Sequence, residues 1–283
     1  MASTSCSRLR MATEHSSGAM WRDRFGPWAL VTGASDGIGQ EMARELARRG
    51  LNLVLVARRE DRLTSLAVEL EGKHKIDCRV IATDLGERAA VEALLVETEP
   101  FDIGLLVACA GFGTAGLFVD LPLASEIDML EVNCSAVLSM THTMARRFVR
   151  RGQGGIILMS SIVAFQGVPY AATYAATKAF VQTLAESIRP ELALAGVDVI
   201  ASAPAPVATG FAARSGLAMG RAEEPGVVAR QTIAALGRKT TVRRGFLAKF
   251  LIGSLATLPR SARTRIMSGI MHGMVRKHAA LQK

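Results

Sequence analysis

Near its N-terminus the chain reads WALVT from Trp28 to Thr32 and then GASDGIG from Gly33 to Gly39. The first run is short and apolar, as in a buried strand, and residues 40–49 repeat their apolar side chains at helical spacing. Glycines between a strand and a helix let the backbone approach a pyrophosphate, and the helix N-terminus offers free N–H groups. This order predicts a dinucleotide-binding unit, the alternative being a tight turn without a ligand. The predicted contacts of this turn are Gly33, Ser35, Asp36, Gly37, Ile38 and Gly39.

A second apolar run, residues 51–57, ends in two arginines, Arg58 and Arg59. In dinucleotide-binding units an acidic residue at this point holds the ribose 2′-hydroxyl of NAD, whereas an arginine accommodates the 2′-phosphate of NADP. The two arginines therefore favour NADP (as NADPH) over NAD. The alternative is that both are solvated charges at the start of a helix.

The alternation of strands and helices continues along the chain. Apolar runs cover residues 79–82, Ile103–Ala108 and Val197–Ala203, and helical patterns cover residues 89–98 and 125–151. Continuous apolar strands in such an alternation are typical of a parallel sheet covered by helices on both faces. We therefore predict an α/β fold in which one domain contains a doubly wound parallel sheet.

A potential acid–base site follows the apolar run at residues 156–159. Ser160 and Ser161 come directly after this run, and Tyr174 and Lys178 lie four residues apart beyond a Gly-Pro loop. Residues four apart share one face of a helix. An ammonium beside a phenol favours the ionised phenolate, which makes a tyrosine usable as a proton donor and acceptor near neutral pH. The same spacing also occurs by chance on many helices.

Four signals now stand in order along the chain. They are TGASDGIG at 32–39, AG at 110–111, Asn133, and Ser161 followed after 13 residues by the pair Tyr174 and Lys178. Together they resemble the short-chain dehydrogenase/reductase family, whose members are single-domain Rossmann oxidoreductases with about seven strands. The resemblance covers residues 26–236. The 13-residue spacing is usual in the family and selects Ser161 rather than Ser160.

The resemblance implies hydride transfer between a nicotinamide cofactor and a ketone or secondary alcohol. Tyr174 would be the general acid in reduction and the base in oxidation, and Lys178 would lower its pKa and bind the nicotinamide ribose. Ser161 would hydrogen-bond the carbonyl oxygen and stabilise the charge developing there. Asn133 would support a proton relay through a kink in its helix and a bound water. These four residues are the expected catalytic set.

The resemblance also extends the cofactor site beyond the glycine turn. Asp84 would lie by the adenine, and the loop after Val197–Ala203 would pass under the nicotinamide. The further cofactor contacts expected are Arg58, Arg59, Asp84, Leu85, Ala110, Gly111, Tyr174, Lys178, Pro204, Val207 and Thr209.

A mobile lid is expected around residues 209–222, with apolar side chains close to it. These side chains favour a lipophilic substrate, acyl-like or steroid-like, although some of them would suit an ordinary core equally well. Phe118 and Tyr170 are expected nearby. The substrate contacts expected are Phe112, Ser161, Phe165, Val168, Tyr174 and Phe211.

The net charge of +9 is unevenly spread along the 283 residues. Residues 225–283 contain 12 Lys or Arg and no Asp or Glu, so the rest of the chain is close to neutral and no nucleic acid partner is expected. After Pro259, apolar residues recur at helical spacing in a basic amphipathic helix. Three interpretations stay open. The helix packs on the body or a second subunit, lies on an anionic membrane surface, or docks an acyl carrier protein or the phosphates of an acyl-CoA.

The expected organisation is a disordered leader at 1–25, a Rossmann domain at 26–238 and a basic amphipathic C-terminal extension at 239–283. The leader has no apolar core of signal-peptide length. The four cysteines show no paired or metal-ligand spacing, which indicates a reduced, intracellular protein without a metal. We expect a cytoplasmic location, with a peripheral position on a membrane as the alternative, and a homodimer or homotetramer, as is common in the family.

The sequence as a whole predicts an NADP(H)-dependent oxidoreductase of lipid metabolism that interconverts a ketone and a secondary alcohol, with Tyr174 as the general acid and base. The alternative is a non-catalytic sensor or scaffold protein. Such a protein would bind NADP(H) tightly without turnover.

Overall fold

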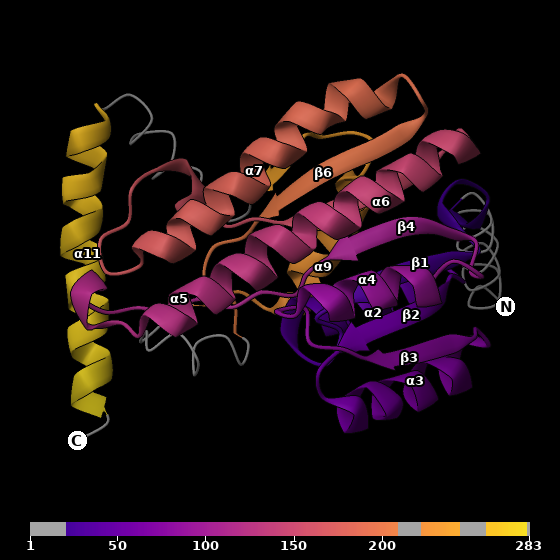
Figure 1. Ribbon diagram of the computed structural model, residues 1–283, viewed down its shortest axis with the longest axis horizontal. Helices are drawn as coiled ribbons and strands as arrows, with labels where there is room; N and C mark the ends of the chain where they lie inside the picture. The colour runs from indigo at the N-terminus through magenta and orange to yellow at the C-terminus, as the bar shows by residue number, and fades with distance from the viewer. Residues whose placement is uncertain (1–20, 209–221, 244–258, 282–283) are drawn as a thin grey trace, which may run out of the picture.

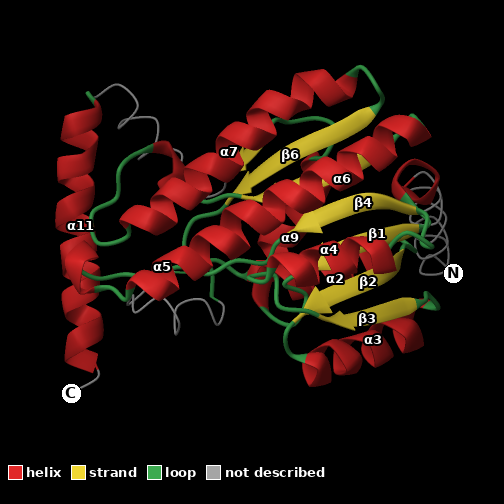
Figure 2. Ribbon diagram, viewed as in Figure 1, coloured by secondary structure: helices red, strands yellow, loops and turns green. Residues whose placement is uncertain are grey.

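Seven strands form a single parallel sheet in the order β3-β2-β1-β4-β5-β6-β7. The computed structural model describes residues 21–208, 222–243 and 259–281. This architecture, drawn in Figures 1 and 2, confirms the predicted doubly wound α/β fold with seven strands. The strands are β1 (Trp28–Thr32), β2 (Asn52–Ala57), β3 (Cys78–Ala82), β4 (Ile103–Ala108), β5 (Gly154–Met159), β6 (Val197–Ala203) and β7 (Thr241–Arg243).

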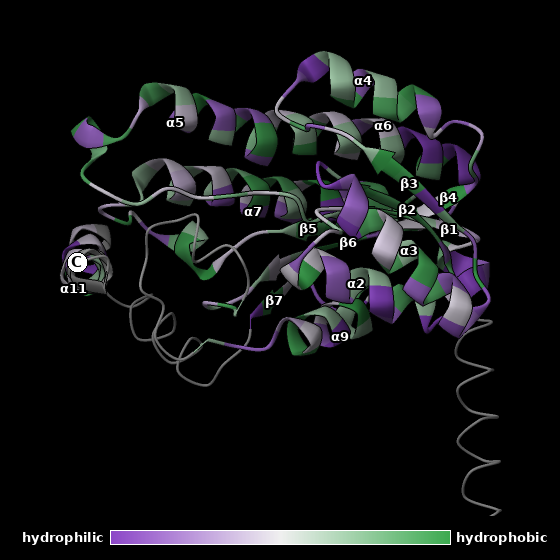
Figure 3. Ribbon diagram, turned by 90° about the horizontal axis from the view of Figure 1, so that it is seen from below, coloured by the Kyte–Doolittle hydropathy of each residue, from purple (hydrophilic) through white to green (hydrophobic). Residues whose placement is uncertain are grey.

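Helices cover both faces of the sheet, which gives the three layers seen in Figure 3. In β1, Ala29 and Val31 belong to one buried cluster and Leu30 to the other, because successive side chains of a strand point to opposite faces. Both faces of β1 are thus buried, which explains why its side chains are apolar from Trp28 to Val31. One layer holds α2 (Gly37–Ala47), α3 (Glu60–His74) and α9 (Pro225–Ala235), and the other α4 (Arg88–Glu97), α6 (Ala136–Arg151) and α7 (Ala172–Ala193).

The direction of winding reverses at β1, which pairs with β2 on one side and with β4 on the other. In doubly wound sheets, ligands bind outside the carboxyl ends of the strands at this switch point. The glycine turn directly follows β1, and the Ala110-Gly111 motif comes shortly after the end of β4. The two motifs therefore meet where the fold is expected to bind a nucleotide.

The helical pattern predicted at 125–151 is interrupted in the structure. It consists of α5 (Leu123–Leu130), a π-helical turn η2 (Glu131–Ser135) and then α6. Asn133 lies in the π-helical turn, so the expected irregularity in its helix is present. Such wide turns are rare and often occur at functional sites.

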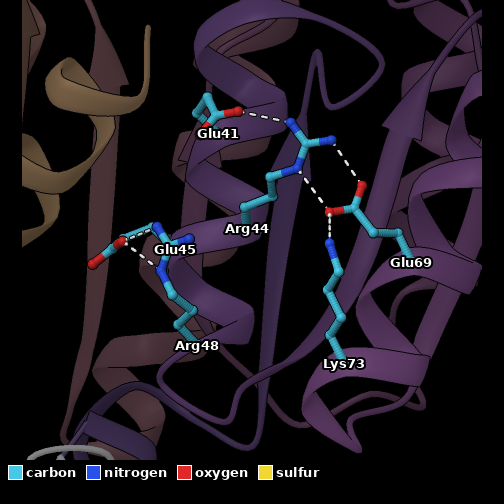
Figure 4. A network of polar contacts seen from close by, with 6 residues as sticks. All are labelled: Glu41, Arg44, Glu45, Arg48, Glu69 and Lys73. Carbon is cyan, nitrogen blue, oxygen red and sulfur yellow. Dashed lines mark hydrogen bonds and ion pairs between the residues drawn. The ribbon is translucent and has the colours of Figure 1, made fainter.

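Charged residues tie α2 to α3 on the outside of the sheet, as Figure 4 shows. Arg44 of α2 donates to Glu69 of α3 through Nε at 3.1 Å and Nη2 at 2.7 Å, and Lys73 adds a third bond to Glu69 at 3.1 Å. The bond from Arg44 lowers the pKa of Glu69 to about 2. This bidentate pair fixes the helix whose N-terminus faces the switch point.

Two predicted domain boundaries are wrong. Residues 21–25 are helical and Phe25 is buried in the core, so the expected leader does not extend to residue 25, and residues 1–20 lie outside the described ranges. The strand β7 pairs with β6 inside the expected C-terminal extension, so the sheet continues beyond residue 238. Three half-buried residues, TVR, carry too little periodicity to be recognised as a strand.

The long helix α11 (Arg260–Leu281) stands across the carboxyl ends of the strands, beside α5 and the start of α7 (Figures 1 and 3). Met271 is buried and Met267 packs against the same cluster, whereas Ile266 and Ile270 are exposed. The described part of α11 therefore packs on the body, which is the first of the three interpretations of the tail. Within the described ranges, we find no helix with the length and apolar character needed to cross a bilayer.

Candidate active site

The glycine turn after β1 is packed too closely for side chains. Gly33 has φ +68°, and a Cβ there would lie 2.9 Å from the backbone nitrogen of Ala110. A Cβ on Gly39 would overlap the carbonyl oxygen of Gly33 and lie 2.7 Å from its carbonyl carbon. The turn therefore brings the start of α2 directly against the end of β1, as close approach to a pyrophosphate requires.

The N-terminus of α2 keeps its backbone donors available. Asp36 precedes the helix, but its side chain makes no capping hydrogen bond to the first turn. Unpaired N–H groups together with the helix dipole suit an anion. Gly33, Ser35, Gly37, Ile38 and Gly39 surround this point, so these residues fit the pyrophosphate of a dinucleotide.

Two arginines lie beside the turn at the end of β2. Arg59 donates to Ser35 Oγ through Nη2 at 3.0 Å and lies 3.6 Å from Asp36. Arg58 lies 3.5 Å from Asp84, and both side chains of that pair are exposed. Exposed ion pairs of this length contribute little to stability. The guanidinium groups are therefore available to a stronger acceptor such as a phosphate. The donor set fits the 2′-phosphate of NADP.

The expected catalytic side chains meet at the end of β5 and the start of α7. Ser161 precedes the short helix η3 (Ile162–Phe165), and its side chain is hydrogen-bonded to Tyr174. The Lys178 Nζ lies 5.8 Å from the ring centre of Tyr174 and donates to the Met159 carbonyl oxygen at 2.9 Å. Both serines are buried, but the Ser160 hydroxyl donates to the carbonyl oxygen of Lys178 at 3.2 Å. The hydroxyl placed against the phenol is thus that of Ser161.

The pKa of Tyr174 differs from the expectation. Burial raises it to about 12, and the hydrogen bond from Ser161 opposes this shift only in part. Burial also lowers the pKa of Lys178 to about 8. Desolvation disfavours the phenolate and the ammonium alike, and Nζ bonds to Met159 rather than to the phenol. Tyr174 is therefore protonated at neutral pH, in the state needed to donate a proton.

The titration of Lys178 predicts a pH-dependent stability. Its folded pKa of about 8 lies below its ordinary value of 10.5, so between these values the unfolded chain binds a proton that the folded protein does not. Stability contributed by Lys178 therefore rises with pH across this window. From about pH 8 to about pH 10, the free energy of unfolding of the wild type should increase by about 2 kcal/mol relative to Lys178→Met. Urea denaturation of both proteins measures this, and parallel pH profiles would refute it.

Asn133 connects three parts of the site. Its Oδ1 accepts from the Phe112 backbone N–H at 3.1 Å, and its Nδ2 donates to the Phe112 carbonyl at 2.8 Å and to Thr177 Oγ1 at 3.1 Å. Thr177 in turn donates to the Tyr174 carbonyl at 2.8 Å. A Cβ on Gly111 would lie 2.8 Å from Asn133 Oδ1, so only glycine fits there. Asn133 thus holds the loop after β4 against the turn of α7 that carries Lys178.

The remaining expected residues occupy several environments. Leu85 and Val207 are buried, and Pro204 accepts a hydrogen bond from the Ile162 N–H at 3.1 Å. Val168 is buried in the cluster that includes Met271. Phe118 is 65% exposed on η1 (Phe118–Asp120), and its place near the substrate stays a prediction. Residues 209–221, and with them the expected contacts Thr209 and Phe211 and nearly all of the lid, lie outside the described ranges.

Some site residues escaped the sequence analysis. Thr177 carries no signal beyond its place next to Lys178, and Met159 takes part only through its backbone. His272 of α11 bonds through Nδ1 with the Tyr170 hydroxyl at 3.0 Å, a contact across 102 residues that no local pattern encodes. Among the described residues, no group of three His, Cys, Asp or Glu side chains could hold a metal ion.

The strand order and the glycine turn at its switch point define a nucleotide-binding Rossmann fold. A sequence profile described as short chain dehydrogenase matches residues 27–219. The chain therefore belongs to the short-chain dehydrogenase family of oxidoreductases, which confirms the resemblance expected from its four motifs.

Individual relatives show what the chain is similar to. It is 33% identical over 180 residues to a 7beta-hydroxysteroid dehydrogenase of Clostridium sardiniense, covering 64% of this chain and 69% of that protein. It is 35% identical over 192 residues to a very-long-chain 3-oxoacyl-CoA reductase of Bos taurus, covering 66% of this chain and 62% of that protein. A short-chain dehydrogenase from Sphingobium yanoikuyae in complex with NADPH has a TM-score of 0.75 and 29% identity, covering 83% of this chain and 98% of that one.

Proposed function

We propose that the protein is an NADP(H)-dependent oxidoreductase that interconverts a ketone and a secondary alcohol on a lipophilic substrate. The observation that carries the proposal is the hydrogen-bonded pair of Ser161 and Tyr174, with Lys178 one turn away, at the same edge of the sheet as the glycine turn. Relatives named for hydroxysteroid and very-long-chain 3-oxoacyl-CoA substrates support a lipophilic substrate, steroid-like or acyl-like.

In reduction, the chain's own residues bind and protonate the carbonyl oxygen. NADPH, which the glycine turn after β1 and the arginines after β2 would hold, would supply the hydride for the carbonyl carbon. The hydroxyl groups of Ser161 and Tyr174 both donate to the oxygen, and Tyr174 transfers its proton as negative charge develops there. The balance is ketone, NADPH and one proton giving the alcohol and NADP⁺. Lys178, held by Met159, provides positive charge beside the phenol, and Asn133 keeps α7 and the loop after β4 in place.

A screen with the purified protein tests this proposal. NADPH oxidation is measured with ketones graded by chain length and ring system, and binding of NADPH is measured separately by its fluorescence. Turnover with a subset of lipophilic ketones is expected. Tight NADPH binding without turnover on any ketone would instead identify a sensor or scaffold.

The arginines after β2 predict the cofactor preference. Arg58→Ala and Arg59→Ala should each weaken NADPH binding by about tenfold to a hundredfold, because a charge-assisted hydrogen bond to the 2′-phosphate contributes about 1.5–3 kcal/mol. NADH has no such phosphate, so its binding should change little. Arg88→Ala is a matched control, since Arg88 forms an exposed pair with Glu92 on α4. Equal affinity of the wild type for NADPH and NADH would exclude the NADP preference.

A further inference from the structure

Arg243 is a site residue that neither the family profile nor the expected motifs include. It ends β7 and lies in register with Ala203, the last residue of β6. Its guanidinium lies 4.1 Å from the ring centre of Phe165, the last residue of η3. Since η3 begins directly after Ser161, the Arg243–Phe165 pair lies at the same edge of the sheet as the catalytic hydroxyls.

The charge of Arg243 is not balanced within the part of the chain that the structure describes. The residue is half-buried, and its Nε is enclosed without a hydrogen-bond partner. No ion pair found among the described residues includes it. A buried cationic group without an acceptor costs free energy, and stacking on an aromatic ring offsets only part of that cost.

The sequence after Arg243 supplies no carboxylate either. Residues 209–221 follow the loop after β6 and residues 244–258 follow Arg243, and neither segment contains an Asp or a Glu. Their charged residues are all basic, and Arg244 directly follows Arg243 in the sequence. No acidic residue follows Arg243 in the sequence, and no ion pair among the described residues joins Arg243 to Glu223, whose backbone bonds to the loop after β6. An unpaired guanidinium of this kind suits an anionic ligand.

The cofactor has its own anion sites elsewhere. The N-terminus of α2 and the arginines after β2 serve the pyrophosphate and the 2′-phosphate, whereas β1, β4 and β5 lie between β2 and β6 in the sheet. Arg243 is thus on the opposite side of the switch point, where Ser161 and Phe165 face the substrate in the proposed function. An anion held there belongs to the substrate.

We propose that Arg243 binds an anionic group of the substrate, with Phe165 as the flat wall against which its guanidinium is held. The substrate class is then a lipophilic ketone that carries a carboxylate or a phosphate away from the reacting carbonyl. A guanidinium binds either group through two parallel hydrogen bonds. The proposal rests on the proposed function, because it assigns the substrate of that same site.

Two matched pairs of substrates distinguish the sources of the anion. One pair is an oxo-steroid carboxylic acid and its methyl ester, and the other is a 3-oxoacyl-CoA and its N-acetylcysteamine thioester, which lacks the phosphates. KM and kcat are measured with NADPH for the wild type, Arg243→Gln and the control Arg238→Gln, which changes an exposed arginine after α9. Arg243→Gln should raise KM for the anionic member of one pair by about 10- to 100-fold and leave its neutral partner unchanged. The pair that responds identifies carboxylate or phosphate.

The proposal is overturned if the wild type does not prefer the anionic member of either pair, or if Arg243→Gln affects both members equally. Arg243→Lys, which keeps the charge, should retain part of the preference, and melting temperatures show whether each variant folds. If the wild type reduces none of the four compounds, the proposed function fails for them. Calorimetric titration of the NADPH-bound protein with the acid, the ester, the acyl-CoA and its thioester still tests the anion site, because equal binding by the wild type and Arg243→Gln would exclude it.

Discussion

Replacing Tyr174 with phenylalanine should lower kcat by about 10²- to 10⁴-fold while NADPH binding stays unchanged. The substitution removes a single oxygen, the one hydrogen-bonded to Ser161, and leaves the ring that packs in the cluster with Val168 and Met271. With its pKa raised to about 12 by burial, the phenol is protonated at neutral pH and is the group that can supply the proton. Phenylalanine cannot supply it.

Tyr170→Phe is the matched control for this experiment. The protein has two tyrosines, and the hydroxyl of Tyr170 bonds to His272 of α11 rather than to Ser161. Its loss should change kcat far less than the loss of the Tyr174 hydroxyl. Steady-state kinetics on a reduced ketone and a fluorescence titration with NADPH provide the two readouts. Full activity of Tyr174→Phe would contradict the mechanism, and a joint loss of activity and NADPH binding would show a structural role instead.

Local patterns were sufficient to predict the sheet and its order of motifs. The strands at Trp28–Thr32, Ile103–Ala108 and Val197–Ala203 have the predicted bounds, because each is a mainly apolar run with a glycine or proline within three residues of its end. The chain order of the motifs also placed Ser161, Tyr174 and Lys178 at one site. Parallel strands bring their carboxyl ends to one edge, so a correct strand assignment already brings the following loops together.

The charge states in the site could not be obtained from spacing. Tyr174 and Lys178 lie one turn apart, as predicted, yet the direction of the tyrosine pKa shift is opposite to the expected one. The direction of the Tyr174 pKa shift depends on how far the phenol is buried and on which acceptor Lys178 Nζ donates to. That acceptor is the backbone carbonyl of Met159. Both are properties of the packed fold, since the acceptor lies 19 residues from the lysine.

The C-terminal helix also shows that sequence spacing alone does not determine which side chains are buried. Two rows of apolar residues, one with Ile266 and Ile270 and one with Met267 and Met271, were equally suited to face the body. Only the second row does so, and the first is exposed. The choice depends on the loop before α7, where Val168 and Ala171 form the cluster that receives Met271. A helical period identifies rows of residues, but the surface opposite selects between them.

Replacing Gly39 with alanine should have the second largest effect, on both stability and cofactor binding. The added Cβ would lie 2.7 Å from the carbonyl carbon of Gly33 and 3.1 Å from the carbonyl oxygen of Thr32. Both neighbours are backbone atoms of the glycine turn and of β1, so no side-chain rotation relieves the contact. The start of α2 must move away from β1, although Arg44 holds the same helix to Glu69 of α3. Overpacking of this kind typically costs about 1–3 kcal/mol of the free energy of unfolding.

The same displacement should weaken NADPH binding by about tenfold to a hundredfold, because the N–H groups of α2 would lose charge-assisted hydrogen bonds to the pyrophosphate. Gly72→Ala in α3 is the control, since its added Cβ would have no atom within 4 Å apart from its chain neighbours and the backbone of its own helix. In a helix interior this change should stabilise the protein by about 0.5–1 kcal/mol and leave NADPH binding as it is. Urea denaturation and NADPH titration compare the two variants. If Gly39→Ala binds NADPH as tightly as Gly72→Ala, the contact between α2 and β1 is not what positions the pyrophosphate, and the anion site must be sought among the arginines after β2.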